Sequence, residues 1–223
     1  MARNRLDLQR RRPTRQPRRR FIIYCEGENT EPGYFAALKS ILRYQLIEIE
    51  TNPVGAPMTT AERAVERAKR EGLAKGAKKP KDSFAQGDQV WAVFDRDEHP
   101  HFHDAVAHCE SKGVRVGRSN PCFELWLILH LADHHAPDGR RQLARRLNEL
   151  HPAYDPHGAK TCGWTTIIPH VESAEGRAQK LPVAREAEGD PHGRPSTTVG
   201  MLTAAIREAA EASTRMPTSS RGP

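Results

Sequence analysis

Short apolar runs bounded by polar turns recur along the first half of the chain. They cover residues 21–25, 46–50, 89–94 and 114–118. The run at 46–50 alternates apolar and acidic residues, which is typical of a half-exposed strand. The run at 89–94, QVWAVF, is continuous and rich in β-branched and aromatic residues, which predicts a strand buried on both faces. The pattern therefore predicts four strands.

Segments with apolar residues at helical spacing separate and follow these strands. We expect helices over residues 30–44, 59–71, 102–111, 125–131, 139–150, 167–181 and 198–212. Thr30 is the expected N-cap of the first helix, and Thr59 forms a capping-box pattern with Glu62. Ser196 or Thr197 is expected to cap the last helix. The segment LWLILHL is apolar nearly all round, which predicts a buried helix.

The alternation of strands and helices predicts an α/β fold. A parallel or mostly parallel sheet flanked by helices is expected, with a helical C-terminal portion. A chain of 223 residues can bury one substantial core, so we expect a single domain over residues 21–213. Residues 214–223 are expected to form a flexible tail.

The positive charge of the chain is concentrated at its amino terminus. Residues 1–20 contain nine arginines and one aspartate, a formal charge of +8 within a total of +7. Their near absence of apolar residues predicts a disordered tail. This tail either binds nucleic-acid phosphates or another polyanion, or it only keeps the protein in solution. The residues expected to contact nucleic acid are Arg11, Arg12, Arg18, Arg19 and Arg20.

Apolar segments and cysteines bear on where the protein resides. No apolar stretch approaches the length of a membrane span, and the arginines are not followed by the apolar segment of a secretory signal. The four cysteines form no C-x-x-C pair, which argues against a disulfide framework and against zinc bound by cysteine. We expect a cytoplasmic protein without a membrane partner.

Acidic residues follow three of the predicted strands. Glu26 follows the first strand, Asp95 and Asp97 the third, and Glu124 the fourth. The carboxyl ends of parallel strands meet at one edge of a sheet, so these carboxylates are expected to converge. Such a group repels itself unless a cation neutralises it, and carboxylate oxygens suit Mg²⁺ or Mn²⁺. The four residues therefore form a candidate metal site.

Structural explanations of the same acidic residues stay open. Asp95 and Asp97 fit a polar turn that closes a strand, and Glu124 fits the first turn of a helix, where the dipole favours a carboxylate. Glu31 either faces the site or is an exposed acid at a helix start. His99 is the histidine nearest to the D-x-D pair and is a candidate general acid or base, with an exposed loop position as the alternative.

Four ordered motifs, IIYCEGENTEPGYF, VWAVFDRDEH, SNPCFELWLILH and PSTTVGML, resemble the RloB family and the abortive-infection proteins related to it. The resemblance spans about residues 20–208. It implies a Toprim-like domain, in which a glutamate after the first strand and a D-x-D pair after the third bind Mg²⁺. These positions correspond to Glu26, Asp95 and Asp97, and the N-P-C-F-E segment places Glu124 beside them.

The resemblance also implies a function. It implies a metal-dependent nuclease of prokaryotic antiphage defence that cleaves RNA, such as tRNA, or DNA. An ATPase partner is implied as well, and the chain itself has no G-x-x-x-x-G-K-[ST] motif for ATP hydrolysis. Related sequences tend to carry a lysine after a tyrosine where this chain has Tyr154 and Lys160. Lys160 is a candidate for neutralising phosphate charge in the transition state.

Two other functions remain compatible with these residues. The chain is alternatively a non-catalytic nucleic-acid-binding or regulatory subunit of an ATPase-containing defence complex. It is also compatible with a phosphotransferase or nucleotide hydrolase that acts on small molecules at the same acidic edge. Metal-dependent cleavage of nucleic acid by the isolated chain distinguishes the nuclease from both.

Overall fold

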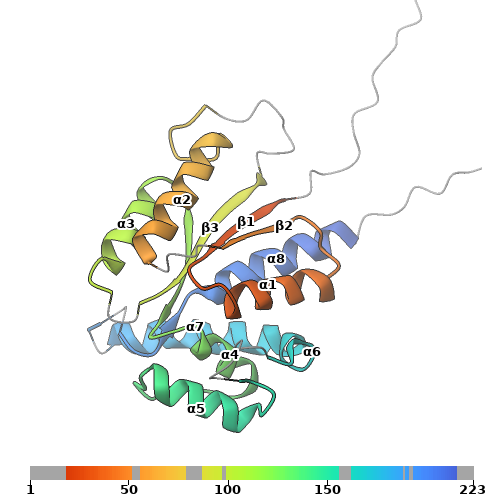
Figure 1. Ribbon diagram of the computed structural model, residues 1–223, viewed down its shortest axis with the longest axis vertical. Coiled ribbons are helices and arrows are strands. Elements are labelled where there is room, and N and C mark those ends of the chain that lie inside the picture. Colours follow the sequence, from red (N-terminus) through yellow and green to blue (C-terminus); the bar gives the residue numbers. More distant parts are fainter. Residues whose placement is uncertain are drawn as a thin grey trace, which may run out of the picture.

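The structure is a computed structural model, which describes residues 19–51, 56–78, 87–96, 99–155, 162–187, 189–190 and 193–214. The described residues form a five-stranded sheet in the order β2-β1-β3-β4-β5 (Figure 1). Its strands are β1 (Phe21–Cys25), β2 (Ile47–Thr51), β3 (Gln89–Asp95), β4 (Arg115–Asn120) and β5 (Ser196–Thr197). β1 to β4 are parallel and β5 is antiparallel to β4. The predicted mostly parallel α/β sheet is therefore confirmed.

Helices connect the strands and form the C-terminal part of the described chain. They are α1 (Thr30–Ile41), α2 (Pro57–Arg70), α3 (Phe102–Ser111), α4 (Glu124–Leu131), α5 (Arg140–Leu150), α6 (Trp164–Ile167), the 3₁₀ helix η2 (Ile168–His170), α7 (Val171–Ala187) and α8 (Val199–Thr214). In the part of the chain that the structure describes, no helix has both the length and the apolar character needed to cross a membrane.

The order of the strands determines which face each helix covers. The chain moves from β1 to β2 through α1, and then returns across β1 to β3 through α2. Because parallel crossovers are right-handed, reversing the direction of winding moves the connecting helix to the other face. α2 and α3 accordingly pack together on one face, and α1 and α8 lie on the other with α4 and α7 (Figure 1).

Two apolar cores follow from the alternation of side chains along the strands. Phe21, Ile23 and Cys25 of β1 belong to the larger core with α1, α4, α7 and α8. Ile22 and Tyr24 belong to the smaller core beneath α2 and α3. Successive strand residues point to opposite faces, so an apolar run without polar interruptions fills both cores at once. This explains why β1, and β3 from Val90 to Phe94, are apolar throughout.

α4 is buried as its sequence predicts. Every residue from Glu124 to His130 is buried, because both α7 and α5 pack against this helix. α5 is amphipathic, with Leu143 and Leu147 buried. α5 therefore forms an outer layer over α4, beyond the helices that contact the sheet.

The first helix differs at its end from the expected 30–44. α1 begins at Thr30, with Asn29 rather than Thr30 at the N-cap position, and it ends at Ile41. Arg43 has a φ of 52°, a left-handed conformation that cannot continue the helix. The Tyr44 hydroxyl then donates a hydrogen bond to the backbone carbonyl of Arg19.

Two other helix starts also differ from the expected positions. α2 begins at Pro57, ahead of the expected cap Thr59, because proline suits the first helical turn. Ser196 or Thr197 is the expected cap of the last helix, but both residues pair with β4 as the edge strand β5. The Thr197 hydroxyl also lies 3.1 Å from that of Ser119 in β4. This strand of two residues carries no periodic signal that would reveal it.

Candidate functional site

The carboxyl ends of β1 and β3 mark the point at which the direction of strand winding reverses. β2 lies on the far side of β1 and β4 on the far side of β3, so the connections leave this point in opposite directions. In open α/β sheets, ligands bind in the crevice at such a switch point. Glu26 directly follows β1 and Asp95 ends β3, so two of the predicted metal ligands flank the crevice.

A cavity of about 210 Å³ lies at this crevice. Its charged lining residues are Glu26, Glu28, Glu31, Asp95, Glu124 and Arg140. The cavity thus combines five carboxylates with one guanidinium. Because the segment after β1, together with β3, α1, α4 and α5, contributes to the lining, carboxylates that are far apart in the sequence meet at one place. We refer to this set of residues as the acidic cavity.

Glu26 and Asp95 are joined through the backbone. Oε2 of Glu26 accepts a hydrogen bond from the backbone N–H of Asp95 at 3.1 Å. The N–H of Glu26 donates to the carbonyl of Val93 at 3.0 Å, which extends the pairing of β1 with β3 by one residue. Both acids are therefore held directly by the sheet.

Asp95 also contacts a helix that follows it by 45 residues. Trp91 and Val93 of β3 face the larger core, so the alternation along the strand directs Asp95 to the same side. There Nη2 of Arg140, the first residue of α5, donates to Oδ2 of Asp95 at 2.9 Å. The Asp95 side chain is 10% exposed and that of Arg140 is 44% exposed. Arg140 therefore supplies positive charge to Asp95 from the solvent side.

Glu124 lies at the inner wall of the acidic cavity. It is the first residue of α4 and only 3% exposed. The hydroxyl of Tyr154 donates to its Oε1 at 2.8 Å. Burial of Tyr154, together with the negative charge of Glu124, raises the pKa of the phenol. The Tyr154 hydroxyl therefore keeps its proton and stays a hydrogen-bond donor. Glu124 is both a helix-start acid and a member of the cavity.

Two further predicted residues lie beside Glu26. Nε2 of His99 is 3.5 Å from Oε1 of Glu26, and the His99 side chain is 38% exposed. The buried Glu31 faces the cavity rather than solvent. Its carboxylate packs against Gly27, where an added Cβ would lie only 2.3 Å from Oε2 of Glu31. Glycine at this position leaves the room that the Glu31 carboxylate occupies.

The donor set suits a hard cation in its chemistry. Within the described residues, no group of three or more His, Cys, Asp or Glu side chains is arranged to hold a metal ion. Asp97 and Lys160 lie outside the described residues. Carboxylate oxygens are the ligands that Mg²⁺ and Mn²⁺ prefer, and the five carboxylates outnumber the one guanidinium of the lining. The residues present therefore fit a divalent cation by ligand type and by charge.

Only two of the arginines predicted to contact nucleic acid, Arg19 and Arg20, lie among the described residues. Arg11, Arg12 and Arg18 lie outside them. Arg20 donates hydrogen bonds to Asp88 at 3.0 Å, and to Glu48 and Glu71 at 3.1 and 2.8 Å. Its guanidinium is thus directed to three carboxylates of the protein itself. Arg20 therefore has a structural role, and its contacts do not support the predicted contact with nucleic acid.

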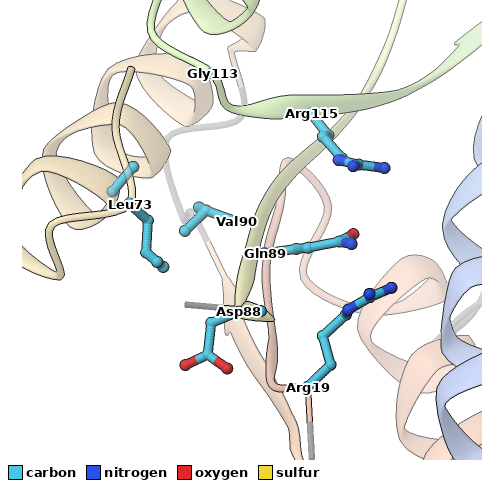
Figure 2. Close-up of a pocket in the computed structure, with 9 residues that line it drawn as sticks. Arg19, Leu73, Asp88, Gln89, Val90, Gly113 and Arg115 are labelled. Carbon is cyan, nitrogen blue, oxygen red and sulfur yellow. The ribbon is translucent and has the colours of Figure 1, made fainter. Parts of the chain in front are cut away.

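Arg19 lines a second cavity, of about 300 Å³, at the amino ends of the strands. Figure 2 shows Arg19, Gln89 and Arg115 extending to the same side of β3. β1 separates this cavity from the acidic cavity, and its five residues span roughly 15 Å. Arg19 is therefore remote from the acidic cavity.

Sequence reasoning did not identify Arg140, although the sequence contains a feature that points to it. α5 has no acidic residue in its first turn, where Arg140 and Arg141 stand instead. The helix dipole disfavours positive charge at this end. A local rule broken in this way points to a partner elsewhere in the fold or outside it. For Arg140 that partner is Asp95.

One comparison with known proteins gives a match. A family model described as RloB-like protein matches residues 21–206, a range that includes all charged residues lining the acidic cavity. Searches of curated proteins and of solved structures return no match. The matched range covers most of the chain, all of the smaller apolar core and all buried residues of the larger core except Ala210. The chain therefore belongs to the RloB-like protein family.

Proposed function

We propose that this protein is a metal-dependent nuclease that hydrolyses phosphodiester bonds of RNA, such as tRNA, or of DNA. The observation that carries this proposal is the acidic cavity, in which five carboxylates surround the switch point of the sheet. Carboxylates gathered at strand ends are the usual means of holding a divalent cation against a phosphate. Membership of the RloB-like family supports the same function.

The proposed ligands of Mg²⁺ or Mn²⁺ are Glu26, Asp95, Asp97 and Glu124. A bound ion would neutralise charge on the phosphate and lower the pKa of a water molecule. The chain's own residues orient these ligands. The backbone N–H of Asp95 fixes Glu26, and the Tyr154 hydroxyl fixes Glu124.

Two other side chains have proposed roles in proton and charge transfer. His99 lies beside Glu26 and is partly exposed, and it is proposed to exchange a proton with the attacking water or with the leaving oxygen. Lys160 is proposed to neutralise phosphate charge. Both roles are secondary to the carboxylates, because charge stabilisation contributes most in such sites.

A second candidate function is that of a non-catalytic nucleic-acid-binding or regulatory subunit. The observation that favours it is the pairing of Asp95 with Arg140, since a carboxylate neutralised by arginine has less need of a cation. The arrangement of the described donors, which form no group of three around one point, favours it as well. In this case an ATPase subunit would supply the activity of the complex.

The biological setting is proposed from the family alone. We infer an effector of prokaryotic antiphage defence that resides in the cytoplasm and acts beside an ATPase partner. Its hydrolysis of nucleic acid would be activated during infection. Cells that carry the Asp95→Asn variant together with the intact partner are expected to lose protection against phage.

Cleavage by the isolated chain tests the nuclease proposal. Purified total tRNA, single-stranded RNA and plasmid DNA are incubated with the protein and Mg²⁺, Mn²⁺ or EDTA. We expect metal-dependent cuts that the isosteric Asp95→Asn variant loses. Asp104→Asn is the matched control, because Asp104 is 67% exposed on α3 and does not line the acidic cavity. Cuts that persist in Asp95→Asn would contradict the proposed metal site, and no cleavage by the wild type would favour the regulatory subunit.

A further inference from the structure

α5 carries an unusual amount of positive charge for a helix that also packs on the protein. Its sequence, RRQLARRLNEL, contains four arginines and one glutamate. Leu143 and Leu147 are buried against α4, whereas all four arginines are exposed. The helix is therefore attached by a leucine stripe and presents arginines to solvent.

Arg141 and Arg145 form a row on the outward side of α5. They are four residues apart, and a helix places such residues on one face. At 100° per residue, this row lies nearly opposite Leu143 and Leu147. Within the described part of the chain, neither arginine forms an ion pair, while Arg146 pairs with Glu149 at 3.4 Å. We call Arg141, Arg145 and Arg146 the α5 surface.

Two half-buried arginines elsewhere in the described chain, Arg67 and Arg207, are neutralised internally. Arg67 of α2 pairs with Glu48, Glu50 and Glu71. Arg207 of α8 pairs in the same way with three glutamates. Arg141 and Arg145 instead repel each other along the helix, and Arg141 also stands against the helix dipole. Because these positive charges destabilise the helix, we expect them to bind an anion from outside the protein.

The α5 surface begins at the acidic cavity. Arg140 reaches Asp95, and Arg141 is the next residue along the helix. Arg145 follows four residues, or roughly 6 Å along the helix axis, further from the cavity. In Figure 1, α5 lies at one end of the molecule, beyond α4 and α7 and away from α2 and α3. The row of arginines therefore leads outward from the cavity.

The chemistry of this surface indicates a polyanion rather than a protein partner. The exposed residues of α5 are Arg140, Arg141, Gln142, Arg145, Arg146 and Glu149. None is apolar, whereas the centre of a protein interface is enriched in aromatic and apolar residues. The acidic cavity would repel a nucleic-acid strand, so a strand that approaches it needs cations close by. Arg19 and Arg20 cannot supply them, because they lie at the opposite edge of the sheet.

We propose that the α5 surface binds the phosphate backbone of a nucleic-acid substrate and leads it to the acidic cavity. The inference rests on the proposed function and adds the place where the substrate binds. Phosphate contacts of this kind position a strand and carry no sequence information. Affinity for RNA and DNA strands should therefore depend on charge and salt more than on sequence.

Binding without cleavage tests this surface. Fluorescence anisotropy measures the affinity of the full chain for labelled single-stranded RNA and DNA in EDTA, between about 50 and about 200 mM salt. The Arg141→Gln/Arg145→Gln variant should bind at least about tenfold more weakly at the lower salt, and the salt slope should fall by about 1.4–1.8. Its thermal stability should be unchanged or higher, because a like-charge pair is removed.

The matched control is Arg63→Gln/Arg70→Gln, which removes two exposed arginines from α2 on the other face of the sheet. It should bind like the wild type. Equal losses in both variants, or no loss in the α5 variant, would overturn the proposed surface. An α5 variant that binds normally but fails to protect cells would overturn it in favour of an acidic protein partner.

The same measurements separate this inference from the nuclease proposal. Weak binding by the α5 variant, in a protein that never cleaves, supports the surface and contradicts the nuclease. Metal-dependent cleavage with normal binding by the α5 variant contradicts the surface and supports the nuclease. If both proposals hold, the α5 variant should have a raised KM and an unchanged kcat.

Discussion

Nη2 of Arg140 lies 2.9 Å from Oδ2 of Asp95, so the first residue of α5 contacts the last residue of β3 across the acidic cavity. This pair brings one positive charge to a group of five carboxylates. A divalent cation bound by Asp95 would compete with the same guanidinium. The pair therefore links the helix that carries the α5 surface to the proposed metal site.

Replacing Arg140 should reveal this competition. Arg140→Ala is expected to lower the stability of the metal-free protein by up to about 1 kcal/mol, since the arginine is partly exposed. The increase in melting temperature on adding Mn²⁺ should be larger in the variant than in the wild type. Thermal unfolding with EDTA and with Mn²⁺ measures both effects. Arg146→Ala on the same helix is the control, and an equal Mn²⁺ effect in all three proteins would rule out the competition.

Tyr154 should stabilise the fold through Glu124. Tyr154→Phe removes the donor to a carboxylate that is 3% exposed, and is expected to cost about 1–3 kcal/mol in the free energy of unfolding. Urea denaturation measures this change. In a Glu124→Gln background the same substitution should cost less, because a neutral acceptor forms a weaker bond. Equal costs in both backgrounds would mean that the hydroxyl acts independently of the Glu124 charge.

His130 should make the protein sensitive to acid. Burial lowers the pKa of His130 to about 4, although its hydrogen bond to the Trp126 carbonyl opposes the shift. The unfolded state takes up a proton near pH 6.5, well before the folded state does, so stability is lost as the pH falls from about 6.5 to about 4. Between pH 7 and pH 5, protonation of His130 is expected to lower the free energy of unfolding by about 2 kcal/mol.

Urea denaturation at pH 7 and pH 5 checks this dependence. His130→Gln should show a smaller loss between the two values than the wild type, even if it is less stable at both. His101→Gln is the control, since the His101 side chain is 72% exposed. A loss in His130→Gln as large as in the wild type would assign the acid sensitivity to other groups.

Gly27 should be required by the site rather than by the fold. A Cβ at this position would meet the end of the Glu31 side chain, which must then move out of its place in the acidic cavity. Gly27→Ala is expected to reduce stability by less than about 1 kcal/mol and cleavage by at least tenfold. Gly176→Ala is the matched control in α7, where nothing lies near the added Cβ, and it should raise stability by about 0.5–1 kcal/mol. Normal cleavage by Gly27→Ala would mean that Glu31 has no part in it.

Arg20 should affect stability and not nucleic-acid binding. Arg20→Met breaks its bonds to Asp88, Glu48 and Glu71, and is expected to cost about 1–2 kcal/mol in the free energy of unfolding. Its affinity for single-stranded RNA should equal that of the wild type below the unfolding temperature. A weakened affinity in a folded variant would restore Arg20 as a nucleic-acid contact.

The elements that the sequence predicted well are those with a strong local signal. β1 and β3 are apolar on both faces because they lie between two apolar cores, and this produces continuous runs. α4 was predicted as buried for a similar reason. The placement of these acids at the ends of elements was also visible, because Glu26 and Asp95 follow apolar runs and Glu124 directly precedes one. Charge and hydropathy in neighbouring residues are enough for such features.

The arrangement of these elements was decided only in the tertiary structure. Whether β2 and β4 lie on opposite sides of β1 and β3 depends on the pairing of strands, and this order creates the crevice between Glu26 and Asp95. Asp95 meets Arg140, which is 45 positions further along the chain, and Glu124 meets Tyr154, which is 30 positions further. A hydropathy pattern records which face of each element is buried. It does not record which elements pack together, and those long-range contacts determine which charges meet at the acidic cavity.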